Sequence, residues 1–191
     1  MFESFKKYIL SRVVITDAEF ERIAAVSTIR RLRKKQYLLQ EGDVWRFNAF
    51  VVSGLVRLYR VDDKGTEHVV NFAKENWWTG DRESLLSGKP SKFNIDAVEP
   101  TEVLLIGKEE FDVICREIPA MATMVHDIIQ KSFVATQNRL LVHKDFTAEE
   151  KYLDMMEKYP DFILRIPLGM IASYLGITPE TLSRIRNQVK K

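Results

Sequence analysis

Residues 171–189, IASYLGITPETLSRIRNQV, are typical of two short helices that meet at a tight turn. The turn falls at Gly176, because glycine adopts a positive φ without a steric penalty. Thr178 suits an N-cap and Pro179 suits the first helical position, so the second helix is expected to begin there. The residues expected on the inner side are Ile171, Ala172, Leu175, Ile177, Leu182 and Ile185. The stretch therefore predicts a helix-turn-helix.

The outward face of the second helix carries side chains that bind DNA in other proteins. The candidate DNA-binding residues are Thr178, Glu180, Thr181, Ser183, Arg184, Arg186 and Asn187. Arg184 is expected to contact guanine and Glu180 a nearby cytosine, and four residues of spacing also allow the two to pair in the free protein. A helical hairpin with a solvated polar face is the alternative. The spacing, the cap and the proline together favour double-stranded DNA as the partner.

Basic residues gather at the same end of the chain. The 191 residues carry a formal net charge of +2. From residue 165 onward the only acidic residue is Glu180. The basic residues there are Arg165, Arg184, Arg186, Lys190 and Lys191. Such an excess favours a polyanionic partner.

The composition argues against several other functions. The single cysteine, Cys115, excludes an internal disulfide, a cysteine-based zinc site and a four-cysteine iron–sulfur cluster. The histidines His68, His126 and His143 are scattered and lack both a nucleophile motif and metal-ligand spacing, so neither an enzyme nor a metal site is predicted. The first 15 residues, MFESFKKYILSRVVI, are interrupted by charges, which predicts a soluble cytoplasmic protein without a membrane segment.

Residues from about 29 to 106 are typical of an all-β unit. Runs such as YLLQEGD and FNIDAVEPTEVLLIG are rich in β-branched and aromatic residues and are interrupted by glycine and aspartate. The segment VDDKGTE predicts a hairpin whose turn contains Gly65. Of the adjacent Trp77 and Trp78, one is expected to anchor the core and the other to face the opposite side.

Helices are predicted on either side of this unit. Residues 2–26 have helical apolar spacing, interrupted at TDAEF, where Thr16 or Asp17 suits an N-cap. A long helix is predicted from Pro119 to about His143, because the segment has no further proline and no glycine.

The long helix carries an interrupted apolar stripe. Its apolar positions are Met121, Met124 or Val125, Ile128, Ala135 and Leu140 or Leu141, and the five residues up to Ala135 are the candidate dimer interface. Periodicity alone favours equally a helix packed on its own β unit and a seam between two copies. A homodimer is the prediction, because two recognition helices must lie about 34 Å apart to enter successive major grooves. A capping box at Thr147 and Glu150 opens a further helix, which predicts domains of residues 1–143 and 144–191.

The order of these parts resembles the Crp/Fnr family of bacterial transcription regulators. The segments YLLQEGD, VVSGLVRLYRVDDKGTE and WTGDRESLLSGKP are similar to its cyclic-nucleotide-binding fold, and residues 171–189 to its DNA-binding motif. The resemblance implies an α+β fold with an N-terminal double-stranded β-helix (jelly-roll) sensor domain, a long dimerisation helix and a small C-terminal winged-helix-like helix-turn-helix domain. It also implies a palindromic operator and RNA polymerase as a partner.

The same resemblance implies a particular DNA site. Glu180, Ser183 and Arg184 match the Glu-x-x-Ser-Arg pattern of the fumarate–nitrate branch. The cyclic-AMP branch has an arginine directly before that glutamate, where this chain has Pro179. The operator is therefore expected to differ from that of the cyclic-AMP branch.

The chain departs from the family at the expected ligand site. Members that bind cyclic AMP carry a Gly-Glu pair that holds the ribose and an Arg-Ser pair that clamps the phosphate. Counting without a gap places Gly80 and Asp81 at the first pair but Ser91 and Lys92 at the second, so the bidentate guanidinium is lost.

On the long helix, Thr136 falls where the family contacts adenine, with Gln137 beside it. Cyclic AMP is therefore not expected to bind tightly, and no cofactor is predicted. The β unit is expected to be an empty scaffold or a pocket for another small effector, with a weak cyclic-nucleotide site as the third reading. The alternative to a regulator is a ligand-binding or protein-interaction module without a DNA function.

Overall fold

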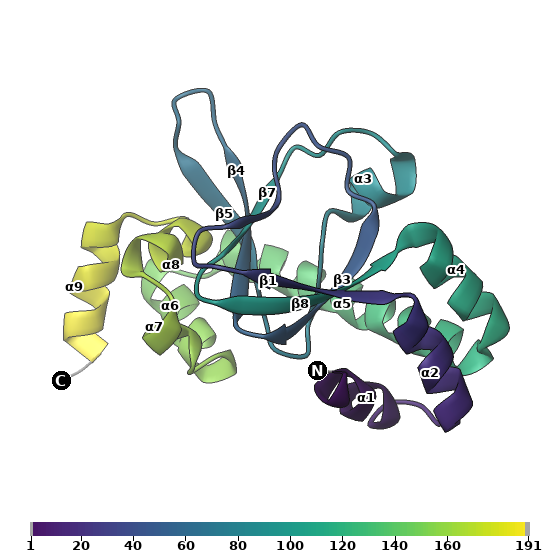
Figure 1. Cartoon of the computed structure of the whole chain (residues 1–191). Coiled ribbons are helices and arrows are strands. Elements are labelled where there is room, and N and C mark those ends of the chain that lie inside the picture. Colours follow the sequence, from purple (N-terminus) through teal and green to yellow (C-terminus); the bar gives the residue numbers. More distant parts are fainter. Residues whose placement is uncertain (1, 190–191) are drawn as a thin grey trace. The chain divides into compact units, whose positions relative to one another are not determined.

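The chain is described from residue 2 to residue 189 in a computed structural model, and it forms two compact units. The roll unit contains the residues up to 60 and residues 71–129. The helical unit contains residues 61–70 and the residues from 130 onward. Figure 1 labels most of the elements of both units. This division differs from the boundary predicted after residue 143. The long helix contributes to both units, and the end of a β-hairpin, residues 61–70, belongs to the helical unit.

The described residues contain eight strands. Their bounds are β1 (Ser27–Leu32), β2 (Tyr37–Leu39), β3 (Phe47–Ser53), β4 (Leu55–Val61), β5 (Glu67–Lys74), β6 (Trp78–Thr79), β7 (Asn94–Ala97) and β8 (Thr101–Gly107). They form two four-stranded sheets in the orders β1-β8-β3-β6 and β2-β7-β4-β5. The pairs β1–β8, β3–β8 and β4–β7 are antiparallel. The all-β unit predicted from about residue 29 to residue 106 is confirmed, and Gly65 has the expected positive φ, of 81°.

The inner faces of the two sheets share one apolar core. The first sheet contributes Val51 and Val103, and the second contributes Val56 and Ile95. All four are at most 1% exposed. Trp77 packs against this core. The side chains of the two sheets bury one another here, and burial of apolar surface is the main favourable term in folding.

A second core covers the other face of the first sheet, because strand side chains alternate between faces. Phe50 belongs to it together with Phe5 and Phe111 from nearby helices. Trp78 packs against the same core, and its Nε1–H donates to the Tyr8 hydroxyl at 3.1 Å. The adjacent tryptophans therefore serve two different cores, as the sequence predicted.

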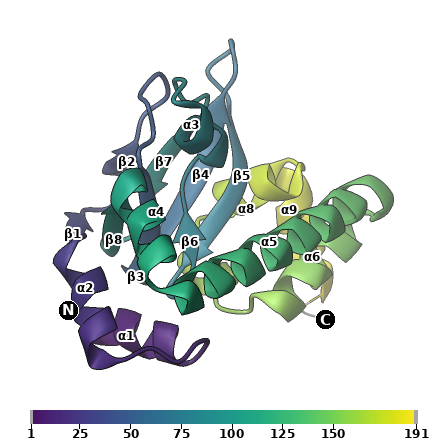
Figure 2. The same ribbon diagram turned by 90° about the vertical axis from the view of Figure 1, so that its right-hand side faces the viewer.

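The described residues contain nine helices. Their bounds are α1 (Glu3–Leu10), α2 (Asp17–Ala25), α3 (Arg82–Ser87), α4 (Lys108–Glu117), α5 (Pro119–Asp145), α6 (Ala148–Lys158), α7 (Phe162–Arg165), α8 (Leu168–Leu175) and α9 (Pro179–Val189). Figure 2 shows α5 as one unbroken helix. None of these helices is both long and apolar enough to cross a membrane.

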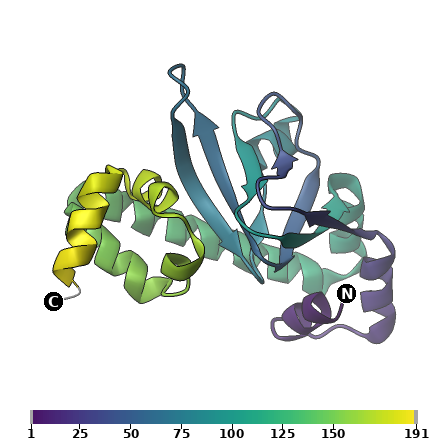
Figure 3. The same cartoon turned by 60° about the vertical axis from the view of Figure 1, so that its left-hand side comes forward.

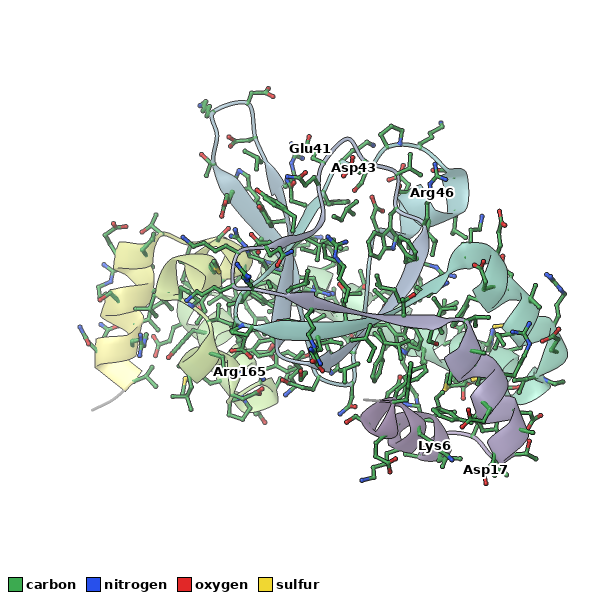
Figure 4. The ribbon with its side chains drawn as sticks, viewed as in Figure 1. Lys6, Asp17, Glu41, Asp43, Arg46 and Arg165 are labelled. Carbon is green, nitrogen blue, oxygen red and sulfur yellow. The ribbon has the colours of Figure 1, made fainter. Side chains whose placement is uncertain are left out.

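Capping residues define the helix starts that the sequence predicted. Thr16 caps α2 in a reciprocal capping box with Glu19, and Thr147 caps α6 in the same way with Glu150. Lys6 of α1 and Asp17 of α2 form an ion pair of 2.6 Å (Figure 4). These local interactions fix helix boundaries that hydrophobic periodicity alone leaves approximate.

The predicted dimer stripe on α5 needs a correction. Met121 is 0% exposed and Met124 is 2% exposed, because both belong to the second core of the roll unit. Val125 and Ile128 are half-buried against the same core. The two methionines have no surface left to bury against a second copy. Of the five predicted residues, Ala135 alone is exposed.

The helical unit packs short helices around a small core. Its buried residues include Tyr152 and Met155 of α6, Phe162 of α7, and Ile171 and Leu182 of the helix-turn-helix. Every element described after residue 107 is a helix. The predicted helix-turn-helix is therefore present, and the strands of a wing are not among the elements described after that point.

Candidate nucleic-acid interface

The turn between α8 and α9 has the geometry that the sequence predicted (Figure 3). Gly176 has φ 68° and ψ 33°, the left-handed conformation that glycine accommodates best. The Ile177 N–H donates to the Ala172 carbonyl at 3.0 Å, which satisfies a carbonyl at the end of α8. Thr178 Oγ1 accepts from the Thr181 N–H at 3.2 Å, so Thr178 caps α9 and Pro179 begins it.

The inner side of the motif is apolar and closed. Five of the six residues predicted there are less than 5% exposed: Ile171, Ala172, Leu175, Leu182 and Ile185. Ile177 is half-buried. Because the inner side is packed against the rest of the unit, the polar side chains of α9 point outward.

The outward face of α9 forms one open hollow of about 690 Å³. Its lining residues are Pro179, Glu180, Ser183, Arg184, Asn187 and Gln188. All six are exposed. Four are predicted DNA-binding residues, which the structure brings onto one surface. Gln188 was not among the predicted DNA-binding residues. Its position four residues after Arg184 indicates that it lies on the same face of the helix.

Three predicted DNA-binding residues do not line this hollow: Thr178, which is exposed at the N-cap of α9, Thr181 and Arg186. Thr181 and Arg186 are half-buried and do not line the hollow. At 100° per residue, Arg186 is rotated by about 200° around the helix from Arg184. Side chains that lie off the exposed face of a recognition helix suit contacts with the phosphate backbone better than contacts with base edges. Lys190 and Lys191, which the sequence placed in the same basic cluster, lie outside the described residues.

The Glu180 carboxylate is oriented by the start of its own helix. A hydrogen bond from its own backbone N–H, and then one with the Thr178 side chain, lower the pKa of Glu180. The carboxylate is therefore ionised at neutral pH. Within the described chain Arg184 makes no ion pair. The pairing of Glu180 with Arg184 that the sequence allowed is absent from this conformation, since the helix start holds the carboxylate.

The predicted ligand residues of the roll unit are arranged differently. Gly80 has φ 142°, and a Cβ at this position would collide with the indole nitrogen of Trp45. The Trp45 side chain is 4% exposed. Its backbone N–H donates to Ser84 Oγ at 2.9 Å, which fixes it beside α3. Trp45 was missed from the sequence, because nothing local indicates that its ring lies against Gly80.

Asp81 and Ser91 are bonded to each other. One carboxylate oxygen of Asp81 accepts from the backbone N–H groups of Glu83 and Ser84, at 3.0 and 3.2 Å, and thereby caps α3. The other accepts from the Ser91 hydroxyl at 2.7 Å. Asp81 is 6% and Ser91 3% exposed. The role of these two residues as ligand contacts stays a prediction, and within the fold the Asp81 carboxylate already accepts three hydrogen bonds, one of them from the Ser91 hydroxyl.

The loop beside them completes this closed arrangement. The Ser91 N–H donates to the Asp43 carbonyl at 2.8 Å, and the Ser91 carbonyl accepts from the Gly42 N–H at 2.9 Å. Figure 4 labels Asp43 on the loop that follows β2. Lys92 points to solvent, with its side chain 79% exposed and its ammonium 4.0 Å from Glu83. The segment that would hold a phosphate is therefore tied to its neighbouring loop.

Comparison with known proteins agrees with this geometry. Residues 29–117 match the model of the cyclic nucleotide-binding domain family. The chain is 25% identical to the transcriptional activatory protein AadR of Rhodopseudomonas palustris, over 91% of this chain and 74% of that protein. It is 24% identical to the transcriptional activator protein Anr of Pseudomonas aeruginosa, over 82% and 68%. The solved structure of FixK2 from Bradyrhizobium japonicum superposes with a TM-score of 0.73 at 22% identity, over 86% of this chain and 85% of that one. The chain has the Crp/Fnr architecture.

The two remaining ligand candidates lie on α5 within the helical unit of this Crp/Fnr fold. Thr136 and Gln137 are exposed. The Thr136 hydroxyl donates to the Ser132 carbonyl of its own helix at 2.8 Å. Their role as adenine contacts stays a prediction that follows from the family pattern.

Proposed function

We propose that the chain is a sequence-specific DNA-binding transcriptional regulator of the Crp/Fnr type. The observation that carries the proposal is the outward face of α9, where Glu180, Ser183, Arg184 and Asn187 share one exposed surface. The relatives named above are called transcriptional activators, which supports the same function. A capped, rigid helix presents these groups, so little conformational freedom is lost on binding.

The chemistry of this face suits base edges in the major groove. The exposed Arg184 guanidinium can donate two hydrogen bonds to guanine, and the ionised Glu180 carboxylate can accept one from cytosine. Ser183 can contact a base or a phosphate. In this proposal Arg186 and Thr181, which lie off the exposed face of α9, contact DNA phosphates. The N-terminus of α9, capped by Thr178, faces the phosphate backbone of the DNA.

The regulator acts as a homodimer in this proposal, with a seam on the second half of α5. Residues 130–138 are all exposed, although an isolated helix rarely remains stable without packing. The large apolar side chains there are Phe133, Val134, Leu140 and Leu141, each more than half exposed. Ala135 lies among them. A second copy would bury this surface and set two α9 helices on one palindromic operator.

We also propose that cyclic AMP binds the roll unit at most weakly. Trp45 packs against Gly80, and Asp81 and Ser91 are bonded to each other. Loss of a bidentate charged contact to the phosphate costs about 1.5–3 kcal/mol, enough to move a micromolar ligand toward the hundred-micromolar range. Calorimetry with cyclic AMP tests this, and a micromolar dissociation constant contradicts it. An effector of another kind and a contact with RNA polymerase are expected from the family architecture.

In vitro selection of duplex DNA by the purified protein, with and without added nucleotides, tests the function directly. The expected result is an enriched palindrome whose half-sites are one helical turn apart and whose binding weakens steeply with salt. If no sequence is enriched and duplex binding is absent at low salt, the chain is instead a ligand-binding or protein-interaction module. Sedimentation of the wild type and of Leu140→Glu tests the dimer, and a monomer at micromolar concentration for the wild type contradicts it.

A further inference from the structure

The end of the β4–β5 hairpin is hydrogen-bonded to the first helix of the helix-turn-helix. Both segments belong to the helical unit. The Val69 N–H donates to Ser173 Oγ at 2.9 Å, and the Ser173 hydroxyl donates to the Glu67 carbonyl at 2.8 Å. Ser173 lies on α8, three residues before Gly176. One hydroxyl therefore links two residues of the hairpin to the helix that precedes the turn.

The position of β5 in its sheet explains why backbone groups of the hairpin need hydrogen-bond partners such as Ser173. β5 is the last strand of its sheet, so one side of its backbone has no neighbouring strand. Val69 is only 6% exposed, so a partner from the protein must largely replace water at its N–H. The Ser173 hydroxyl accepts from the Val69 N–H and donates to the Glu67 carbonyl, so it supplies both an acceptor and a donor to this edge strand.

Arg139 of α5 reinforces the same junction. Its guanidinium donates to the Val70 carbonyl at 3.0 Å. Burial raises the pKa of the neighbouring Tyr174 hydroxyl, while the charge of Arg139 and a hydrogen bond from it act in the opposite direction. Arg139 thus contacts both the hairpin and α8. We name Ser173 and Arg139, with the backbone of residues 67–70, the hairpin latch.

We infer that Ser173 and Arg139 are positioning residues for DNA binding. The inference rests on the proposed function, because it assigns them the task of holding α8, and through the Gly176 turn α9, in the orientation that DNA requires. Neither residue lines the outward face of α9. Breaking the latch should therefore lower affinity for every sequence in the same proportion and leave the base preference unchanged.

The latch itself is tested by hydrogen–deuterium exchange of the full-length protein without DNA. In Ser173→Ala the Val69 amide should exchange about tenfold faster, because it loses its hydrogen-bond acceptor. Ser173→Thr retains a hydroxyl and should restore slow exchange. The matched control is Ser87→Ala at the end of α3, where the hydroxyl donates to the Glu83 carbonyl at 2.7 Å, and this variant should leave the Val69 amide unchanged. Unchanged exchange in Ser173→Ala overturns the latch.

The positioning role is tested by titrating the same variants with the selected duplex and with unrelated duplexes. Ser173→Ala should bind all of them about fivefold to tenfold more weakly, with the salt slope and the selected motif unchanged, and Ser173→Thr should recover most of the affinity. Unchanged affinity, or an altered motif, overturns the role. If the wild type binds no duplex, the proposed function and the positioning role fail together, and the exchange experiment still decides whether the latch exists.

Discussion

The phosphate segment of the roll unit and the helix-turn-helix both resemble family motifs, but their polar side chains are used in opposite ways. In the roll, Asp81 and Ser91 are buried and bonded to each other. On α9, Ser183, Arg184 and Asn187 are exposed on one face. A motif residue is available to a ligand only where the fold has not already satisfied its hydrogen bonds. The comparison therefore supports the proposal that α9 carries recognition, and it shows that Asp81 and Ser91 already form hydrogen bonds within the roll unit.

The largest expected effect tests whether buried polar groups of the roll are structural. Arg57 forms a bidentate pair with Asp96, at 2.8 and 2.9 Å, and both side chains are about 6% exposed. Asp96→Ala would leave the guanidinium charge buried without this partner, so the roll unit should lose about 3–5 kcal/mol of unfolding free energy. Urea unfolding followed by tryptophan fluorescence measures the change.

The matched control for this variant is the exposed pair of Arg31 with Glu102, at 2.7 Å. Arg31→Ala should cost less than about 1 kcal/mol, because its side chain is 68% exposed and solvent screens the pair. Equal losses in Asp96→Ala and Arg31→Ala would contradict a structural role for the buried pair.

The second prediction tests the other side of the comparison, on α9. Arg184→Ala should weaken binding of the selected duplex by about 1–3 kcal/mol per half-site and flatten the preference at one base pair. Arg186→Ala is the control, since Arg186 does not line the exposed face of α9. It should weaken all sequences alike and reduce the salt slope by about one. Selection of DNA by each variant measures both effects, and an unchanged motif for Arg184→Ala would show that this residue does not read a base.

The third prediction concerns the bond between Asp81 and Ser91. Ser91→Ala removes the hydroxyl that donates to a buried carboxylate oxygen, so unfolding free energy should fall by about 1–3 kcal/mol. Ser87→Ala, at an exposed hydroxyl at the end of α3, serves as the control and should cost less. Denaturant unfolding tests this. A neutral Ser91→Ala combined with a loss of nucleotide binding would return Ser91 to the role of a ligand contact.

The smallest effect is expected from His143 of the helical unit. Burial, and then the charges of Lys151 and Arg139, lower the pKa of His143 below its ordinary value of 6.5. The His143 imidazole therefore binds a proton more readily in the unfolded chain than in the folded one. As the pH falls from about 6.5 through the folded pKa of His143, this difference lowers the free energy of unfolding. His143→Gln should flatten this part of the stability curve. His126→Gln, at an exposed site, is the control, and identical curves for His143→Gln and wild type would contradict the assignment.

The features predicted correctly from the sequence depend on neighbours in the chain. Thr16 and Thr147 cap their helices because the partner glutamate lies three residues on. The turn glycines Gly65 and Gly176 have positive φ, a property of the residue itself. Exposure on α9 follows from its 3.6-residue period, which is why four of the DNA-binding candidates fall on one face.

The errors arose where distant segments meet. Met121 and Met124 satisfy the spacing of a dimer stripe, but helices far away in sequence cover them first. The hydrogen bond from Ser91 to Asp81, which comes from beyond α3, was also not predicted from the sequence. The latch of Ser173 with residues 67–69 joins parts of the chain more than 100 residues apart and has no local signature.

The sequence by itself therefore determined the elements, their caps and the helix-turn-helix, because backbone conformation and amphipathic period are encoded within a few residues. Only the tertiary structure decided which polar and apolar side chains remain available. Whether a side chain is available to a ligand or a partner depends on what packs against it. The fold places Trp45 against Gly80 and Ser91 against Asp81. A hydrogen bond or an apolar contact already made within the chain is not offered to a ligand or a partner.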